Sequence, residues 1–402
     1  MARPHPALLE LAAGRPLPTT PTDVEWLMRS ALEHHMNGLL WTRARAGELD
    51  AGSQWREALA GLDVVTRARH RRIWEVLASI RTRLNGLGIE FAVLKGVPAE
   101  ARWYDRVGER PCRDLDLLLS PAHLHRVGEV LDDLHPGHPL RDSYQAMFDR
   151  GIACSLDLEV EGVAVDLHVE LFKLGPPCRD PERLWAHTVP YPLADGTEVL
   201  VLDAELSLVH FLVHLSKDSF CWLLGFADVA RILERETLDW DGIERLVADA
   251  GLDAPVWGGV SAVADTLGLR TPRPPSRDWR GRLWSLIWRP SVRLGGDAGW
   301  VRHRHRPLWL PFVTDVGIAP ALRWEWAQVT LTPALARQAN PGHRGPWWWR
   351  LILGRLGRMA GRRSALRRLR QHPHAQDRER RRLRPRGAWR PLRSGSSGRQ
   401  PA

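Results

Sequence analysis

The chain has 402 residues, with 57 lysines and arginines against 47 aspartates and glutamates and a formal net charge of +10. No run approaches the roughly 18 to 20 apolar residues that span a bilayer, and Pro4 and Pro6 interrupt the stretch where a secretory signal needs a continuous apolar core. The four cysteines form no Cys-x-x-Cys pair, which argues against a zinc site and a disulfide framework. We therefore expect a cytoplasmic protein, without a transmembrane segment, that is long enough for two domains.

The first half of the chain predicts helices followed by a core of mixed strands and helices. Residues 1–88 predict an N-terminal helical region, with the clearest helices over 24–40 and 55–87. We assign residues 89–200 to an α/β core. Its expected elements are strand, helix, strand, helix and β-hairpin, over residues 89–94, 97–104, 113–119, 121–134 and 154–169.

Two carboxylates in the second expected strand are the most informative feature of the core. Asp114 and Asp116 are two residues apart, so in a strand they point to the same face, while Leu115 and Leu117 point to the other. Unpaired buried charge is costly, so such a pair faces water or binds a cation, and a hard cation such as Mg²⁺ prefers oxygen ligands. The alternative is a strand end with two solvated acids.

A third acid is expected from the β-hairpin that follows. Asp166 lies in its second strand, and Asp157 and Glu159 share one face of its first strand. The pattern alone leaves these three acids in competition.

The last part of the chain predicts more helices and then a basic tail. Residues 201–340 predict a helical C-terminal domain, strongest over 203–267, and the tryptophans of 279–350 are assigned no ligand. Residues 343–402 carry 18 arginines and two acids, a net +16 that leaves −6 for the rest of the chain. The tail, taken as 341–402, is either a partly disordered extension or a basic segment that binds nucleic acid, anionic lipid or an acidic protein.

Several short motifs carry a resemblance to a known family. They are residues 34–40, 94–96, Tyr104, 113–118, 165–168, 210–218 and 224–230. In these motifs and in the order of its elements, the chain resembles the nucleotidyltransferase fold of the DNA polymerase β superfamily. More narrowly, it resembles a largely uncharacterised bacterial nucleotidyltransferase family over roughly residues 5–340. It differs from many superfamily members in having Lys95-Gly96 where they have a Gly-Ser pair.

The resemblance implies an α+β fold, with a small mixed sheet and helices as the core between N- and C-terminal helical regions. It also implies site residues. Asp114, Asp116 and Asp166 would be the catalytic acids and the ligands of Mg²⁺ or Mn²⁺, with two ions expected. Lys95, Gly96 and Arg113 would bind the nucleotide. Further candidates are His168, His214, Lys217 and Asp228.

Each of these candidates has a plainer interpretation. Lys95 is otherwise a solvated residue at a strand end, and Arg113 otherwise pairs with Asp114. His168 is equally well explained as a structural histidine. Ordinary packing and surface roles explain His214, Lys217 and Asp228 as well as a place in a cleft does.

Together these features predict a metal-dependent nucleotidyltransferase. It would move an NMP from an NTP to an unknown acceptor, such as a small molecule, sugar, peptide or protein, and release pyrophosphate. The sequence does not identify the nucleotide or the acceptor. The alternatives are a non-catalytic member that binds nucleotide or a partner, and a protein that associates with nucleic acid or a membrane surface through its basic tail.

Overall fold

The computed structural model describes residues 4–18, 21, 23–137, 155–172, 180–192, 196–217, 220 and 222–271. All of them belong to one unit of the chain, Met1–Gln338. The tryptophan-rich stretch and the basic tail lie outside the described residues, and the expected domain limits stay predictions. In the described part of the chain, no helix is both long enough and apolar enough to cross a membrane.

Four helices precede the sheet, namely α1 (Pro6–Ala12), α2 (Val24–Glu33), α3 (Asn37–Arg45) and α4 (Ser53–Gly86). The single helix expected over 24–40 is wrong, because His35 has a φ of 59° and separates α2 from α3. This left-handed conformation interrupts a right-handed helix. Near the start of α3, Gly38 packs closely against the backbone of Gly108, because a Cβ on Gly38 would overlap the carbonyl oxygen of Gly108.

Within the described residues, six strands form one mixed sheet in the order β3-β4-β2-β1-β6-β5. They are β1 (Phe91–Leu94), β2 (Asp114–Leu119), β3 (Ser155–Val160), β4 (Val163–His168), β5 (Thr188–Pro192) and β6 (Glu198–Leu202). The expected hairpin is confirmed as β3 and β4, joined by Glu161 and Gly162 with φ of 49° and 78°. Two positive φ values are what a two-residue hairpin turn requires. Strands β5 and β6 were not expected.

The other helices in the part of the chain that the structure describes lie between and after the strands. They are α5 (Gly96–Trp103), the 3₁₀ turn η1 (Pro121–Arg126), α6 (Val127–Leu134), α8 (Pro181–Trp185), α9 (Ala204–Lys217), α10 (Leu223–Arg235), α11 (Trp240–Ala250) and α12 (Asp253–Leu267). The helix expected over 121–134 therefore begins as a 3₁₀ turn and continues as α6.

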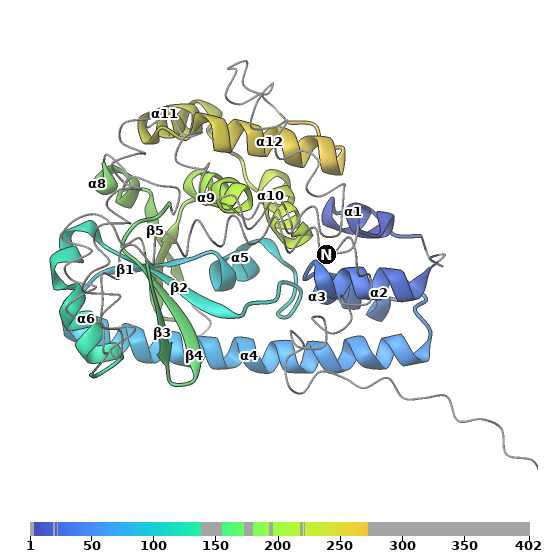
Figure 1. The fold of residues 1–402 in the computed structure, drawn as a ribbon, viewed down its shortest axis with the longest axis horizontal. Coiled ribbons are helices and arrows are strands. Elements are labelled where there is room, and N and C mark those ends of the chain that lie inside the picture. The colour runs from blue at the N-terminus through green and yellow to red at the C-terminus, as the bar shows by residue number, and fades with distance from the viewer. Residues whose placement is uncertain are drawn as a thin grey trace, which may run out of the picture. The chain divides into compact units, whose positions relative to one another are not determined.

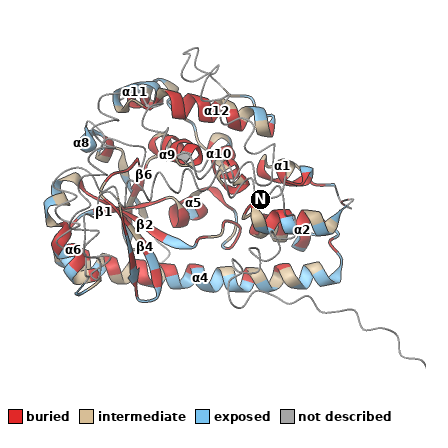
Figure 2. Ribbon diagram, viewed as in Figure 1, coloured by how far each residue is buried: buried red, intermediate tan, exposed pale blue. Residues whose placement is uncertain are grey.

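The two faces of the sheet bury different sets of side chains. One face packs against α4 and α6 and takes Leu115 and Leu117 from β2. The other face carries Leu118 and packs against α5, α9 and α10, and α4 and α9–α12 lie on opposite sides of the sheet (Figure 1). The central strands β1, β2 and β4 are largely buried between these layers (Figure 2). The α+β class expected from the sequence is confirmed, and the face shared with α9 and α10 is the one on which Asp116 lies.

Candidate active site

Two parallel strands bring two of the expected acids side by side. In the pairing of β2 with β4, Asp116 lies opposite Asp166. Residues directly opposite each other on neighbouring strands share a face of the sheet. Both carboxylates therefore lie on the face that packs against α5, α9 and α10. Asp116 is 2% exposed, and Asp166 is partly buried. The register of this long-range pairing, rather than any local pattern, makes the two acids neighbours.

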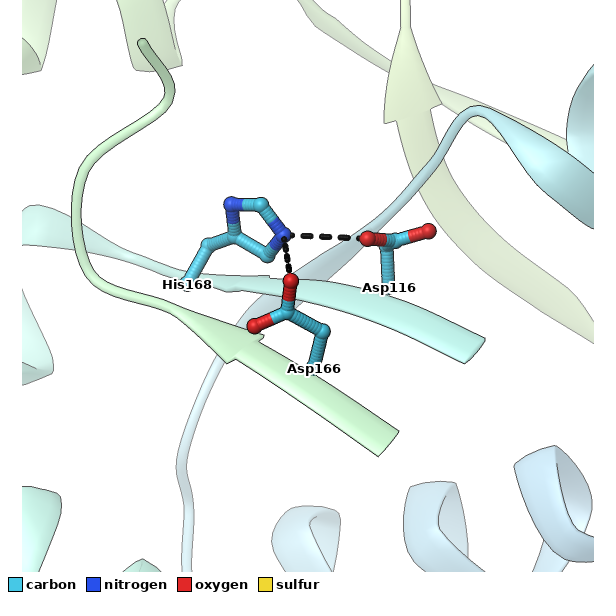
Figure 3. Close-up of side chains that lie close together, drawn as sticks. All are labelled: Asp116, Asp166 and His168. Atoms are coloured by element: carbon cyan, nitrogen blue, oxygen red, sulfur yellow. Dashed lines mark hydrogen bonds and ion pairs between the residues drawn. The ribbon is translucent and has the colours of Figure 1, made fainter. Parts of the chain in front are cut away.

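His168 joins the two carboxylates from the end of β4. Its Nε2 lies 3.0 Å from Asp116 Oδ1 and 3.2 Å from Asp166 Oδ2 (Figure 3). Because both contacts are to carboxylate oxygens, we assign the proton to Nε2, which then donates to both acids. The three ligand atoms lie within 4.8 Å of one another, which suits a shared metal ion. His168 therefore belongs to the centre of the acidic cluster.

Asp114 lies at the exposed beginning of β2, opposite Ala164 and on the same face as Asp116. The structure does not bring it into the close cluster with His168. The protein around it removes part of its hydration, and the Asp116 carboxylate repels a second negative charge, so the pKa of Asp114 is raised. A bound cation would stabilise the charged form of the Asp114 carboxylate.

The competing acids of the hairpin lie further from Asp116. Asp157 is opposite Asp166 in the pairing of β3 with β4, and Glu159 is opposite Ala164. Both are exposed on β3, which forms the edge of the sheet. Asp166 is thus the only one of the three hairpin acids whose strand is hydrogen-bonded to β2.

Lys95 is paired with the buried carboxylate. Its Nζ lies 2.9 Å from Asp116 Oδ1 and 3.2 Å from His214 Nε2. Burial by itself lowers the pKa of Lys95, but the carboxylates, led by Asp116, outweigh it and raise the pKa. Burial likewise disfavours the charged form of Asp116, yet Lys95 and His168 hold its pKa well below the usual range. Both partners are therefore charged at neutral pH, and the interpretation of Lys95 as a solvated residue is wrong.

The Lys95-Gly96 turn is held by a second, buried ion pair. Asp228 accepts two hydrogen bonds from Arg110, at 2.7 Å to Nε and 2.9 Å to Nη2, and one at 2.7 Å from the Tyr104 hydroxyl. Arg110 Nη1 also donates to the carbonyl oxygen of Gly96 at 3.4 Å. Arg110, which no local sequence pattern marks, thus connects Asp228 to the Gly96 turn. Asp228 is 1% exposed.

The remaining candidates lie on α9. The His214 ring is near-parallel to that of His210, with centroids 6.3 Å apart, and its Nε2 contacts Lys95. His214 thus lies beside the acidic cluster. Lys217 is the last residue of α9, and its side chain lies outside the described residues.

Arg113 is exposed beside Asp114, and its described contact is with His35 rather than with that acid. Arg113 Nη2 lies 3.1 Å from His35 Nδ1, and the His35 ring stacks on Trp222 with centroids 4.9 Å apart. Burial and the Arg113 charge lower the pKa of His35 to about 4. His35 is therefore neutral at pH 7 and accepts a hydrogen bond from Arg113. Neither His35 nor Trp222 was expected at this position.

The low pKa of His35 predicts a loss of stability in mild acid. An unfolded histidine takes up a proton near pH 6.5, whereas folded His35 resists until about pH 4. As pH falls through this window, the folded state should lose up to about 3 kcal/mol relative to a His35→Asn variant, since asparagine also tolerates a positive φ. Urea unfolding of both proteins between pH 7 and pH 4 measures the difference. A difference that does not change with pH contradicts the prediction.

The donor set fits a hard or borderline divalent cation. Asp116 and Asp166 supply adjacent carboxylates, and Asp114 supplies a third on the same face. His168 would add an imidazole nitrogen in the tautomer that carries its proton on Nδ1 instead of Nε2. Carboxylates suit Mg²⁺ and Mn²⁺. In this structure the Lys95 ammonium compensates the charge of the buried Asp116 carboxylate. The site therefore stabilises a positive charge next to this carboxylate.

Comparison with known proteins adds a family to this geometry. A family model described as an uncharacterised nucleotidyltransferase matches residues 20–268. Among solved structures, an antigenic nucleotidyltransferase-like protein from Paracoccidioides brasiliensis matches 52% of this chain and 92% of its own, at 11% identity and a TM-score of 0.25. No curated protein matches the chain. Because the family match spans more than half of the 402 residues and includes the whole acidic cluster, the chain belongs to the uncharacterised nucleotidyltransferase family.

Proposed function

We propose that this protein is a metal-dependent nucleotidyltransferase that transfers an NMP from an NTP to an acceptor. The observation that carries the proposal is the opposition of Asp116 and Asp166 on parallel strands, with Asp114 on the same face. The family supports a role in nucleotidyl transfer. The acceptor and the nucleotide are left open, because no described feature selects among small molecules, sugars, peptides and proteins.

The proposed reaction is an in-line attack on the α-phosphate. An acceptor oxygen or nitrogen forms a bond to the α-phosphorus while the bond from phosphorus to the β-phosphate oxygen breaks, and pyrophosphate leaves with that electron pair. The acceptor loses a proton in the same step. Negative charge accumulates on the phosphate oxygens in the transition state, so catalysis depends on positioning and on positive charge.

The residues of the site divide this work. Asp114, Asp116 and Asp166 would hold Mg²⁺ or Mn²⁺, as two ions, which would stabilise the charge on the attacking and leaving oxygens. Asp166 is less buried than Asp116, so we assign Asp166 as the base that takes the proton released by the acceptor. Lys95 offers an ammonium to the triphosphate, and Arg113 offers an exposed guanidinium beside Asp114.

Asp166 and its neighbour Asp157 provide a matched test of the site. We expect Asp166→Asn to lower pyrophosphate release at least about 100-fold, because it removes a metal ligand and the proton acceptor. Asp157→Asn, which removes an exposed acid directly opposite on β3, should leave the rate within about twofold by the same argument. Pyrophosphate release is measured with each NTP and Mg²⁺ or Mn²⁺. Equal losses in the two variants would mean that the acidic face acts only through its total charge.

Label transfer identifies the acceptor. Each α-labelled NTP is incubated with the protein, Mg²⁺ or Mn²⁺, and either cell lysate or candidate acceptors, and the labelled product is separated by size. Labelled product that requires Asp116 supports the proposal. Nucleotide binding without labelled product or pyrophosphate release would favour the non-catalytic alternative instead.

A further inference from the structure

One oxygen of the acidic cluster already has two nitrogen donors. Asp116 Oδ1 lies 2.9 Å from Lys95 Nζ and 3.0 Å from His168 Nε2. The Lys95 donor is an ammonium, which carries a positive charge. A divalent cation bound by this carboxylate would have to share the oxygen with an ammonium about 3 Å away, and like charges at that distance repel strongly.

Lys95 is placed to leave this position. It caps α5 with a φ of 29°, a strained conformation for a residue with a side chain, and this turn directs the side chain toward Asp116. Its side chain is 15% exposed, and His214 Nε2 is within hydrogen-bond distance of Nζ at 3.2 Å. A lysine side chain is a flexible stem of four carbons. The ammonium can therefore move from the carboxylate to a neighbouring anion while the backbone of the turn stays in place.

We infer that Lys95 and the divalent cation compete for Asp116, and that the triphosphate relieves this competition by giving the Lys95 ammonium a new anionic partner. The inference rests on the proposed function and deepens it. It makes metal and nucleotide bind with positive coupling, since each ligand favours the state in which Lys95 has left Asp116. Coupling of this kind is reciprocal, so each ligand must tighten the other by the same factor.

The test compares Mn²⁺ binding by the full chain and by Lys95→Met, which keeps the length of the side chain and removes its charge. We expect Lys95→Met to bind Mn²⁺ alone at least about tenfold more tightly than the wild type, because the competing ammonium is gone. Arg29→Met is the charge-matched control, since Arg29 is 63% exposed on α2 and pairs with Glu25. Its Mn²⁺ affinity should equal that of the wild type.

Coupling is tested with non-transferable α,β-methylene analogues of the four NTPs. In the wild type, the analogue that binds should tighten Mn²⁺ at least about tenfold, and in Lys95→Met this gain should shrink to about twofold or less. Chelation of Mn²⁺ by the free analogue is the same for every variant and cancels in the comparison. Equal gains in the wild type and Lys95→Met would overturn the exchange of partners.

Two further variants separate the possible failures. Asp116→Asn should abolish Mn²⁺ binding, and if it does not, the proposed metal site itself is wrong. If Asp116→Asn abolishes binding while Lys95→Met binds Mn²⁺ no more tightly than the wild type, only the competition is wrong. Should Lys95→Met fail to fold, Lys95→Gln serves in its place, and Lys95→Arg, which keeps the charge, should retain the weak Mn²⁺ affinity of the wild type.

Discussion

Replacing Asp116 with asparagine should lower pyrophosphate release at least about 100-fold, because a neutral amide is a poor ligand for a hard cation. The same change should lower the free energy of unfolding by about 1–3 kcal/mol, since the Lys95 ammonium loses its carboxylate. The loss of stability stays moderate because the Lys95 side chain can still reach water. Steady-state pyrophosphate release and urea unfolding measure the two effects.

A double variant separates the two effects of this change. In Asp116→Asn combined with Lys95→Met, neither partner is left as an unpaired charge, so stability should return to within about 1 kcal/mol of the wild type. Activity should stay as low as in the single variant. If activity returns together with stability, Asp116 matters for folding and not for the reaction.

Replacing Asp228 with asparagine should destabilise the protein by about 3–5 kcal/mol, the usual cost of breaking a buried ion pair. Arg110 would keep a buried charge, because its guanidinium makes both of its short ion-pair contacts with Asp228. Tyr104→Phe removes one hydrogen bond to the same carboxylate and should cost about 1 kcal/mol. Unfolding in guanidinium chloride measures both values.

The surface offers a matched control for this pair. Asp105 is 70% exposed and pairs with Arg235 at 2.7 Å, so Asp105→Asn should change stability by less than about 1 kcal/mol. A similarly small effect for Asp228→Asn would mean that water reaches the Arg110 guanidinium and that the pair is not fully desolvated.

The buried pair also links stability to the site. Arg110 connects Asp228 on α10 to the carbonyl oxygen of Gly96, and Gly96 is adjacent to Lys95. A Cβ on Gly96 would lie 3.3 Å from Cys112 Sγ, so the turn is also tightly packed on that side. Through Arg110, α10 therefore contacts the turn that carries Lys95, the residue that neutralises Asp116.

Local patterns were sufficient for part of the fold and part of the site. Alternation along β2 placed Asp114 and Asp116 on one face, because the two-residue period of a strand depends only on the strand itself. The β3–β4 hairpin followed from alternation around Glu161-Gly162. The family was suggested by short motifs and confirmed by the family match. The strands β5 and β6 were missed because neither carries a clear alternation of apolar and polar residues, and β5 contains two prolines.

The partners of the site residues were decided by the tertiary structure. The opposition of Asp116 and Asp166 depends on the register between β2 and β4, which is set by pairing across a long connection. The contacts of Lys95 with Asp116, of Arg110 with Asp228, and of Arg113 with His35 join segments far apart in the chain. The sequence by itself determined which residues carry charge and which face of a strand they share. Which partner lies within hydrogen-bond distance depends on how the layers pack, and local periodicity contains no information about that distance.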